Sequence, residues 1–145
     1  MLEARIRIQA LALVRRGDRL LVEQGRDEVK DETFFRLLGG TVEFGEKGAD
    51  TVRRELREEL GADVEVCALV TSIENLFTYE GEAWHDLCLV YECSSRDKGL
   101  YSLDEWEAEE MTPNGPITHL VSWRRVDSFG PDRGNLYPEE LLDLL

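Results

Sequence analysis

Residues 40–62 have the sequence GTVEFGEKGADTVRRELREELGA, and this stretch carries the strongest pattern in the chain. Its second half predicts a helix over Ala49–Leu60, because apolar residues recur at spacings of three and four while charged residues fill the other faces. The apolar positions are Ala49, Val52, Leu56 and Leu60. Gly61 follows at a position where a left-handed glycine commonly ends a helix. We therefore expect one amphipathic helix here.

Three glutamates can share one side of this helix. Glu55 precedes Glu58 and Glu59 by three and four residues, so their carboxylates can project in one direction. Clustered carboxylates repel one another unless a cation is present, and oxygen ligands suit Mg²⁺ or Mn²⁺. Such an ion usually completes its shell with waters and substrate phosphates, which indicates phosphate chemistry. An isolated glutamate cluster is more often a solvated helix face, so the cluster alone does not decide the function.

Two neighbouring features fit the same chemistry. The Gly39-Gly40 turn lets the backbone approach closely, and its carbonyl can serve as another oxygen ligand. Arg54 can pair with an acid such as Glu46 and hold the preceding loop against the helix.

The spacing of seven residues across 40–62 decides between a metal site and a solvated helix face. These residues are Gly40, Glu46, Arg54, Glu55, Glu58, Glu59 and Gly61. At average composition each of these positions matches by chance about one time in fifteen. A chance match at all seven is therefore expected at fewer than about one in a million starting positions. The residues resemble the Nudix box, G-x5-E-x7-R-E-U-x-E-E-x-G-U, in which U is aliphatic. Leu56 fills the first U, and Ala62 fills the last with a smaller residue than usual.

This resemblance to MutT-like Nudix hydrolases implies a fold and an activity. The implied fold class is α/β, an α/β/α sandwich with a mixed central sheet and the box helix beside it, formed here by residues 1–145 as a single domain. The implied activity is hydrolysis of a nucleoside diphosphate linked to another moiety, with Mg²⁺ or Mn²⁺ as cofactor.

The resemblance also implies roles for individual residues. Glu58 and Glu59 are similar to the principal metal ligands of the family, and Glu55 to a ligand or general base. The carbonyl of Gly39 is similar to a further ligand. The implied loop brace is the pair Glu46 and Arg54, so the expected catalytic residues are Glu46, Arg54, Glu55 and Glu58.

A distal carboxylate ligand is harder to assign. Many family members place one a few residues before the Trp of a late strand, and here Trp123 is preceded by Thr118 and His119 instead. Three acidic residues of the 94–116 segment are candidates for this ligand instead: Glu107, Glu109 and Glu110.

Residues outside the box are expected to choose the substrate. Arg36 lies just before the box and can contact a phosphate, although a surface charge is an equally good interpretation. Tyr79 and Trp84, with Phe77, can stack on a base; packing in the core or in a possible homodimer is the more frequent role of such aromatics. His85 and His119 fit no nucleophile or zinc spacing, so we expect both to be structural.

The rest of the chain predicts a mixed α/β domain without a linker. Expected strands cover residues 6–14, 20–22, 34–38, 64–70, 84–93 and 119–126. Residues 26–33 are expected to be a charged loop, and 94–116 a long acidic functional loop. A short helix is expected to begin near Pro138.

Composition limits the partners and the compartment. The formal net charge of −14 repels nucleic-acid backbones and anionic membranes, so we expect neither a nucleic-acid polymer nor a membrane as partner. No apolar run approaches the roughly 20 residues of a membrane helix. Cys67, Cys88 and Cys93 lie in apolar, strand-like stretches, and we expect buried free thiols in a reducing cytoplasm.

Two functions from different classes remain open at this stage. The first is a metal-dependent pyrophosphohydrolase. The alternative is a non-catalytic Nudix-fold sensor that binds nucleotides, although such a domain is expected to lose box carboxylates and this chain keeps them. An acidic interaction domain built on residues 94–116 leaves the box unexplained.

Overall fold

The computed structural model describes residues 4–145 and contains one α-helix, α1 (Gly48–Leu60). The strands are β1 (Ile6–Arg16), β2 (Arg19–Asp27), β3 (Glu32–Leu37), β4 (Gly39–Thr41), β5 (Val64–Tyr79), β6 (Glu82–Ser95), β7 (Glu105–Thr112), β8 (Gly115–Arg125) and β9 (Asn135–Tyr137). Three 3₁₀ turns are η1 (Lys98–Tyr101), η2 (Val126–Ser128) and η3 (Glu139–Leu144). Within residues 4–145, no helix has the length and apolar character needed to cross a membrane.

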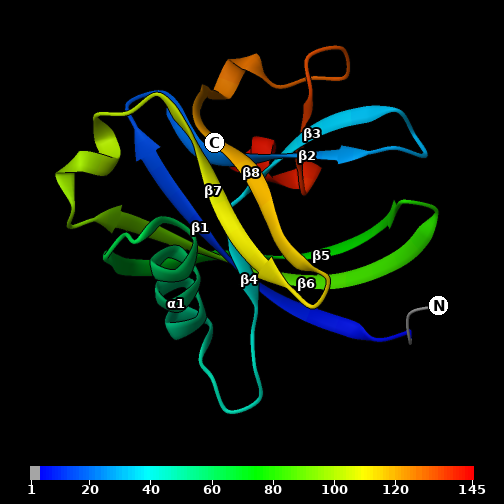
Figure 1. The fold of residues 1–145 in the computed structure, drawn as a ribbon, viewed down its shortest axis with the longest axis horizontal. Helices are drawn as coiled ribbons and strands as arrows, with labels where there is room; N and C mark the ends of the chain where they lie inside the picture. The colour runs from blue at the N-terminus through cyan, green and yellow to red at the C-terminus, as the bar shows by residue number, and fades with distance from the viewer. Residues whose placement is uncertain (1–3) are drawn as a thin grey trace.

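The strands form a mixed sheet that opens into two arms (Figure 1). In the first arm β6 pairs with β5 antiparallel and with β1 parallel, and β4 pairs antiparallel with the other edge of β1. In the second arm β2 pairs antiparallel with β3 and β8, β8 with β7 antiparallel, and β3 with β9 parallel. The end of β1 joins the arms by pairing with β2, where Arg15 faces Leu20. The predicted mixed sheet is confirmed.

Apolar side chains fill both sides of this sheet. Residues 10–14 of β1 are all buried, so this strand is covered on both faces. One face packs against Val52 and Leu56 of α1, and the other against Leu136 and the terminal 3₁₀ turn at Leu141. The second helical layer of the sandwich is therefore short, because η3 replaces the expected terminal helix.

Helix α1 follows the sequence prediction closely. Gly61 has φ of 65°, and its N–H donates to the carbonyl of Arg57 at 2.9 Å while the next N–H donates to Leu56 at 3.3 Å. These two bonds satisfy carbonyls that the last helical turn leaves free. The glycine cap thus ends the helix at Leu60, as predicted.

The acidic segment 94–116 is not a long loop, so that prediction is wrong. It contains η1 and β7, and β7 forms a hairpin with β8. Alternate residues of β7 face outward, and these exposed positions hold Glu105, Glu107 and Glu109. Acidic residues on an edge strand discourage pairing with other chains. Their charge obscured the alternation in the sequence.

The predicted loop 26–33 is also shorter than expected. Strand β2 continues to Asp27 and β3 begins at Glu32. The buried carboxylate of Asp27 accepts hydrogen bonds from the N–H groups of Val29 and Lys30, both at 3.0 Å. This side chain closes a tight turn between the strands. The strands predicted at 64–70 and 119–126 likewise extend further, as β5 and β8.

The cysteines divide into two classes. Cys88 and Cys93 are buried free thiols, as predicted, and burial raises the pKa of each to about 12. Cys67 is exposed, which corrects the prediction for that residue. The register of β5 against β6 shifts between Val66 and Ala68, so the simple alternation used in the sequence argument fails at this point.

Candidate active site

A cavity of about 290 Å³ lies where the first half of β1, β4 and the face of α1 meet β2, β3 and β7. Residues from these elements line it: Arg7, Gln9, Leu11, Glu23, Arg36, Leu37, Gly39, Gly40, Thr41, Glu43, Glu55, Glu59 and Glu110. Among the predicted site residues, it brings together Gly39, Glu55, Glu59 and Arg36. Five of the lining side chains are carboxylates, so the cavity is strongly acidic.

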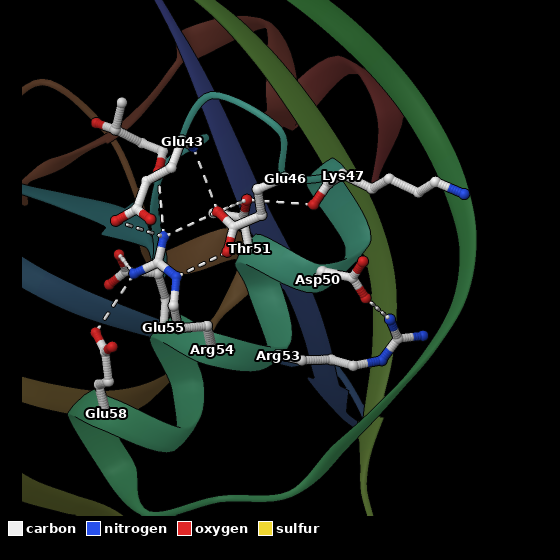
Figure 2. Close-up of polar contacts among 10 residues, drawn as sticks. Glu43, Glu46, Lys47, Asp50, Thr51, Arg53, Arg54, Glu55 and Glu58 are labelled. Atoms are coloured by element: carbon white, nitrogen blue, oxygen red, sulfur yellow. Dashed lines mark hydrogen bonds and ion pairs between the residues drawn. The ribbon is translucent and has the colours of Figure 1, made fainter.

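Arg54 holds the loop before α1 against the helix (Figure 2). Its Nε donates to Oε2 of Glu46 at 2.9 Å and its Nη2 to Oε1 at 3.0 Å, a two-pronged contact. The hydroxyl of Thr51 donates to Glu46 at 2.6 Å, and Arg54 also donates to the carbonyl of Thr41 at 3.3 Å. The predicted pairing of Glu46 with Arg54 is therefore present in the structure.

This contact lowers the pKa of Glu46 to about 2, chiefly through the hydrogen bonds from Arg54 and then that from Thr51. A carboxylate whose pKa is lower in the folded than in the unfolded chain stabilises the fold above its unfolded pKa, near 4.5. That stabilisation is lost as the pH falls toward the folded pKa.

Replacing Glu46 by glutamine is therefore expected to lower the melting temperature at pH 7 and to change it little at pH 2. The difference between the two proteins should close between about pH 4.5 and pH 2, and thermal melting across that range measures it. Asp50→Asn, which breaks an exposed pair with Arg53 on the same helix, is the control. A melting-temperature gap that stays constant down to pH 2 would contradict this assignment.

Arg54 also contacts the metal-ligand candidates on α1. Its Nη1 lies 2.9 Å from Oε1 of Glu55 and 3.5 Å from Oε2 of Glu58. Glu58 has 60% of its side chain exposed and is not among the residues that line the cavity. Figure 2 shows Arg54 between these carboxylates and those of Glu43 and Glu46. One guanidinium thus offsets the repulsion among several acids.

Two glycines allow the β4 backbone to approach its neighbours closely. A Cβ on Gly40 would lie 2.3 Å from Oε1 of Glu55. A Cβ on Gly39, where φ is 155°, would lie 2.0 Å from the carbonyl oxygen of Ala10. Both glycines line the cavity, so the β4 backbone lies directly beside the acidic cluster.

Glu59 is the least satisfied of the acids. Its Oε2 is buried and has no hydrogen-bond partner among the described residues. Burial raises the pKa of Glu59 well above its usual range, and the nearby charges of Glu23, Glu55 and Glu110 raise it further. Burial also raises the pKa of Glu55, against the opposing charge of Arg54. Leaving a buried carboxylate oxygen unpaired costs free energy, so this arrangement favours a cation.

Glu23 is a cavity residue that the sequence argument missed. It follows the apolar run Leu20–Val22 in β2, and only 4% of its surface is exposed. Its Oε1 accepts a hydrogen bond from Nε of Arg36 at 2.6 Å. A single acid directly after an apolar strand core is a signal that was available in the sequence.

Among the three alternatives for a distal carboxylate, the structure brings one to the cavity. Glu110 faces inward from β7, and its Oε2 lies 2.7 Å from Nε2 of His119 on β8. Glu107 and Glu109 are exposed on the opposite side of the strand. Side chains alternate between the two faces of β7, so Glu110 faces the cavity while Glu107 and Glu109 face away from it.

A family model described as the NUDIX domain matches residues 5–145. The chain belongs to the NUDIX family. Membership confirms the resemblance drawn from residues 40–62 and makes the protein a hydrolase of phosphoric anhydride bonds. NUDIX hydrolases act on nucleotide derivatives and generally use a divalent metal such as Mg²⁺.

Solved NUDIX structures share the fold. A MutT NUDIX hydrolase from Burkholderia pseudomallei has a TM-score of 0.60 and 20% identity, with 96% of each chain covered. An ADP-ribose pyrophosphatase from Streptococcus suis has a TM-score of 0.58 and 17% identity over 95% of this chain and 87% of that one. A UDP-X diphosphatase has a TM-score of 0.63 and 15% identity over 99% of this chain and 63% of that one.

The NUDIX acids of this chain suit a hard divalent ion. Within residues 4–145, no three His, Cys, Asp or Glu side chains already form a closed metal-binding cluster. The fit rests instead on the donor set, which consists of carboxylate and carbonyl oxygens, and on the unpaired buried oxygen of Glu59. Oxygen ligands of this kind match Mg²⁺ or Mn²⁺.

Two predicted substrate residues of this NUDIX domain lie outside the cavity. The hydroxyl of Tyr79 donates to the carbonyl of Arg26 at 3.1 Å, and its ring packs edge-on against Phe34. Trp84 stacks against Phe77 with an interplanar angle of 11°. Neither aromatic is among the residues that line the cavity.

Proposed function

We propose that the protein is a metal-dependent pyrophosphohydrolase that cleaves a nucleoside diphosphate linked to another moiety. The observation that carries this proposal is a buried oxygen of Glu59 that has no hydrogen-bond partner within residues 4–145, in a cavity lined by four further carboxylates. Such a cavity repels the phosphates of a substrate unless a divalent cation enters with them. The retained acids favour this enzyme over a non-catalytic nucleotide sensor.

In this proposal, Glu55, Glu58, Glu59 and the carbonyl of Gly39 hold Mg²⁺ or Mn²⁺, and Glu110 adds a distal carboxylate. The bound ion supplies neutralisation of phosphate charge and lowers the pKa of water. Because Glu58 is largely exposed and is not among the lining residues, its carboxylate has to turn toward the cavity to join the others.

The chain itself then performs the remaining tasks. Either Glu55 or Glu58 accepts the proton of the attacking water, whose oxygen bonds to phosphorus as the bridging P–O bond breaks. Arg54 and Glu46 position the loop and helix for this step. Arg36 has one nitrogen bound to Glu23 and is only half buried, so it can orient a substrate phosphate.

The substrate class rests on charge and on family. The names of two solved relatives, an ADP-ribose pyrophosphatase and a UDP-X diphosphatase, both denote diphosphates that carry a nucleoside. We propose the same class here, with nucleoside triphosphates, nucleotide sugars and dinucleoside polyphosphates as its members. The two buried free thiols fit a reducing cytoplasm as the site of action.

Phosphate release from a panel of these compounds, with Mg²⁺ and with excess EDTA, tests the proposal. We expect turnover of at least one compound with Mg²⁺ and none in EDTA. Full activity in EDTA would refute the metal-dependent mechanism. Tight binding of a nucleotide without turnover in any metal would favour the sensor instead.

A further inference from the structure

Arg7 lines the cavity from the beginning of β1 and is held in one orientation. Its Nε and Nη2 each donate to one oxygen of Asp86 at 2.8 Å, and Asp86 is only 4% exposed. The two residues face each other because β1 and β6 pair in parallel, with Arg7 opposite Asp86. The guanidinium lies 4.2 Å from the centre of the Trp84 ring. Asp86 thus holds one edge of the guanidinium, and Trp84 covers one of its faces.

This arrangement is poorly suited to binding phosphate. A buried carboxylate that accepts two hydrogen bonds neutralises the Arg7 charge, whereas Arg36 keeps a partly exposed guanidinium among the acids of the cavity. Arg7 lines the cavity and keeps 24% of its side chain exposed, and with one face on Trp84 the guanidinium has its opposite planar face left for a ligand. Guanidinium planes stack well on aromatic rings, because their charge is delocalised and weakly hydrated.

The position of Arg7 matches the outer part of a nucleotide. Arg7, Gln9 and Leu11 all line the cavity from alternate positions of β1, and Leu11 pairs with Gly39 next to the acidic cluster. Arg7 precedes Leu11 by four residues of the strand, which separates the two residues by about 13 Å. This is comparable to the reach of a nucleoside diphosphate from its base to its terminal phosphate.

We propose that Arg7 is a specificity-determining residue whose free guanidinium face stacks on the aromatic base of the substrate. Trp84 and Asp86 are positioning residues that act through Arg7. The inference rests on the proposed function, because that function supplies the class of ligand. It also gives Trp84 a part in recognition without a direct contact to the base.

Calorimetric titration with nucleoside 5′-monophosphates of the four common bases tests this role, and ribose 5-phosphate is the base-free probe. Each is titrated in Mg²⁺ into the wild-type protein and into Arg7→Lys, which keeps the charge and loses the plane. We expect the preferred nucleotide to bind about five- to ten-fold more weakly to Arg7→Lys, with ribose 5-phosphate unchanged. Trp84→Leu should reduce the same preference.

Arg53→Lys is the matched control, since Arg53 also pairs with an aspartate but lies outside the cavity. Equal weakening of the nucleotide and ribose 5-phosphate by Arg7→Lys would overturn the inference in favour of a phosphate contact. Wild-type protein that binds nucleotides no better than ribose 5-phosphate would also overturn it. These titrations need no turnover, so base-dependent binding without hydrolysis refutes the proposed function alone, and hydrolysis without base dependence refutes this inference alone.

Discussion

Replacing Glu59 by glutamine is expected to lower turnover about a thousand-fold while the fold persists. The amide cannot supply the charge that a divalent ion needs, and such an ion contributes several kcal/mol to the transition state, where 1.4 kcal/mol corresponds to about ten-fold. The melting temperature in EDTA should equal or exceed that of the wild type. The reason is that burial near Glu23, Glu55 and Glu110 disfavours an ionised group at this position, and the glutamine amide carries no charge.

Steady-state kinetics with the best substrate of the panel, together with melting curves with and without Mn²⁺, checks this prediction. Mn²⁺ should raise the melting temperature of the wild type and have little effect on Glu59→Gln. Glu109→Gln is the control, because Glu109 is exposed on the outer side of β7. Unchanged turnover in Glu59→Gln would remove this residue from the proposed metal site.

Replacing Arg54 by lysine is the second change with a large expected effect, a loss of about 100-fold in kcat. Lysine keeps the charge but cannot reproduce the two-pronged contact with Glu46 while also reaching Glu55 and the carbonyl of Thr41. The loop and the helix acids would then be misplaced, and an error of about 1 Å in a catalytic geometry can cost about 100-fold.

The measurement is kcat for Arg54→Lys beside Arg53→Lys, a neighbouring arginine whose partner Asp50 is exposed. We expect a lower melting temperature and lower kcat for the first variant and near wild-type values for the second. If Arg54→Lys matches the wild type in both quantities, the positioning role assigned to Arg54 is wrong.

The sequence predicted those features that depend on local spacing. The helix and its glycine cap follow from a period of three to four residues and from the left-handed conformation of Gly61. The pairing of Glu46 with Arg54 also lies within one local segment. Strand alternation was readable in β1, where apolar residues mark both faces, but not in β7, where outward glutamates made the segment resemble a loop.

The complete cavity could not be predicted, because its residues come from strands far apart in the sequence. Glu23 and Arg36 reach it through the pairing of β2 with β3, and Glu110 through the β7–β8 hairpin beside β2. Tyr79 and Trp84 were expected to touch the substrate, yet both pack against neighbouring side chains outside the lining. Sequence distance and aromatic character carry no information about which face of a curved sheet borders a cavity.

The sequence by itself determined the family, the amphipathic helix that ends at Leu60 and the acids that this helix presents, since these follow from spacing along one continuous segment. Only the tertiary structure decided which carboxylates face one cavity and that one buried oxygen of Glu59 has no hydrogen-bond partner in the described part of the chain. It also decided that Arg7 is locked between Asp86 and Trp84. Those properties depend on burial and on strand register, and both arise when distant strands come together in the folded chain.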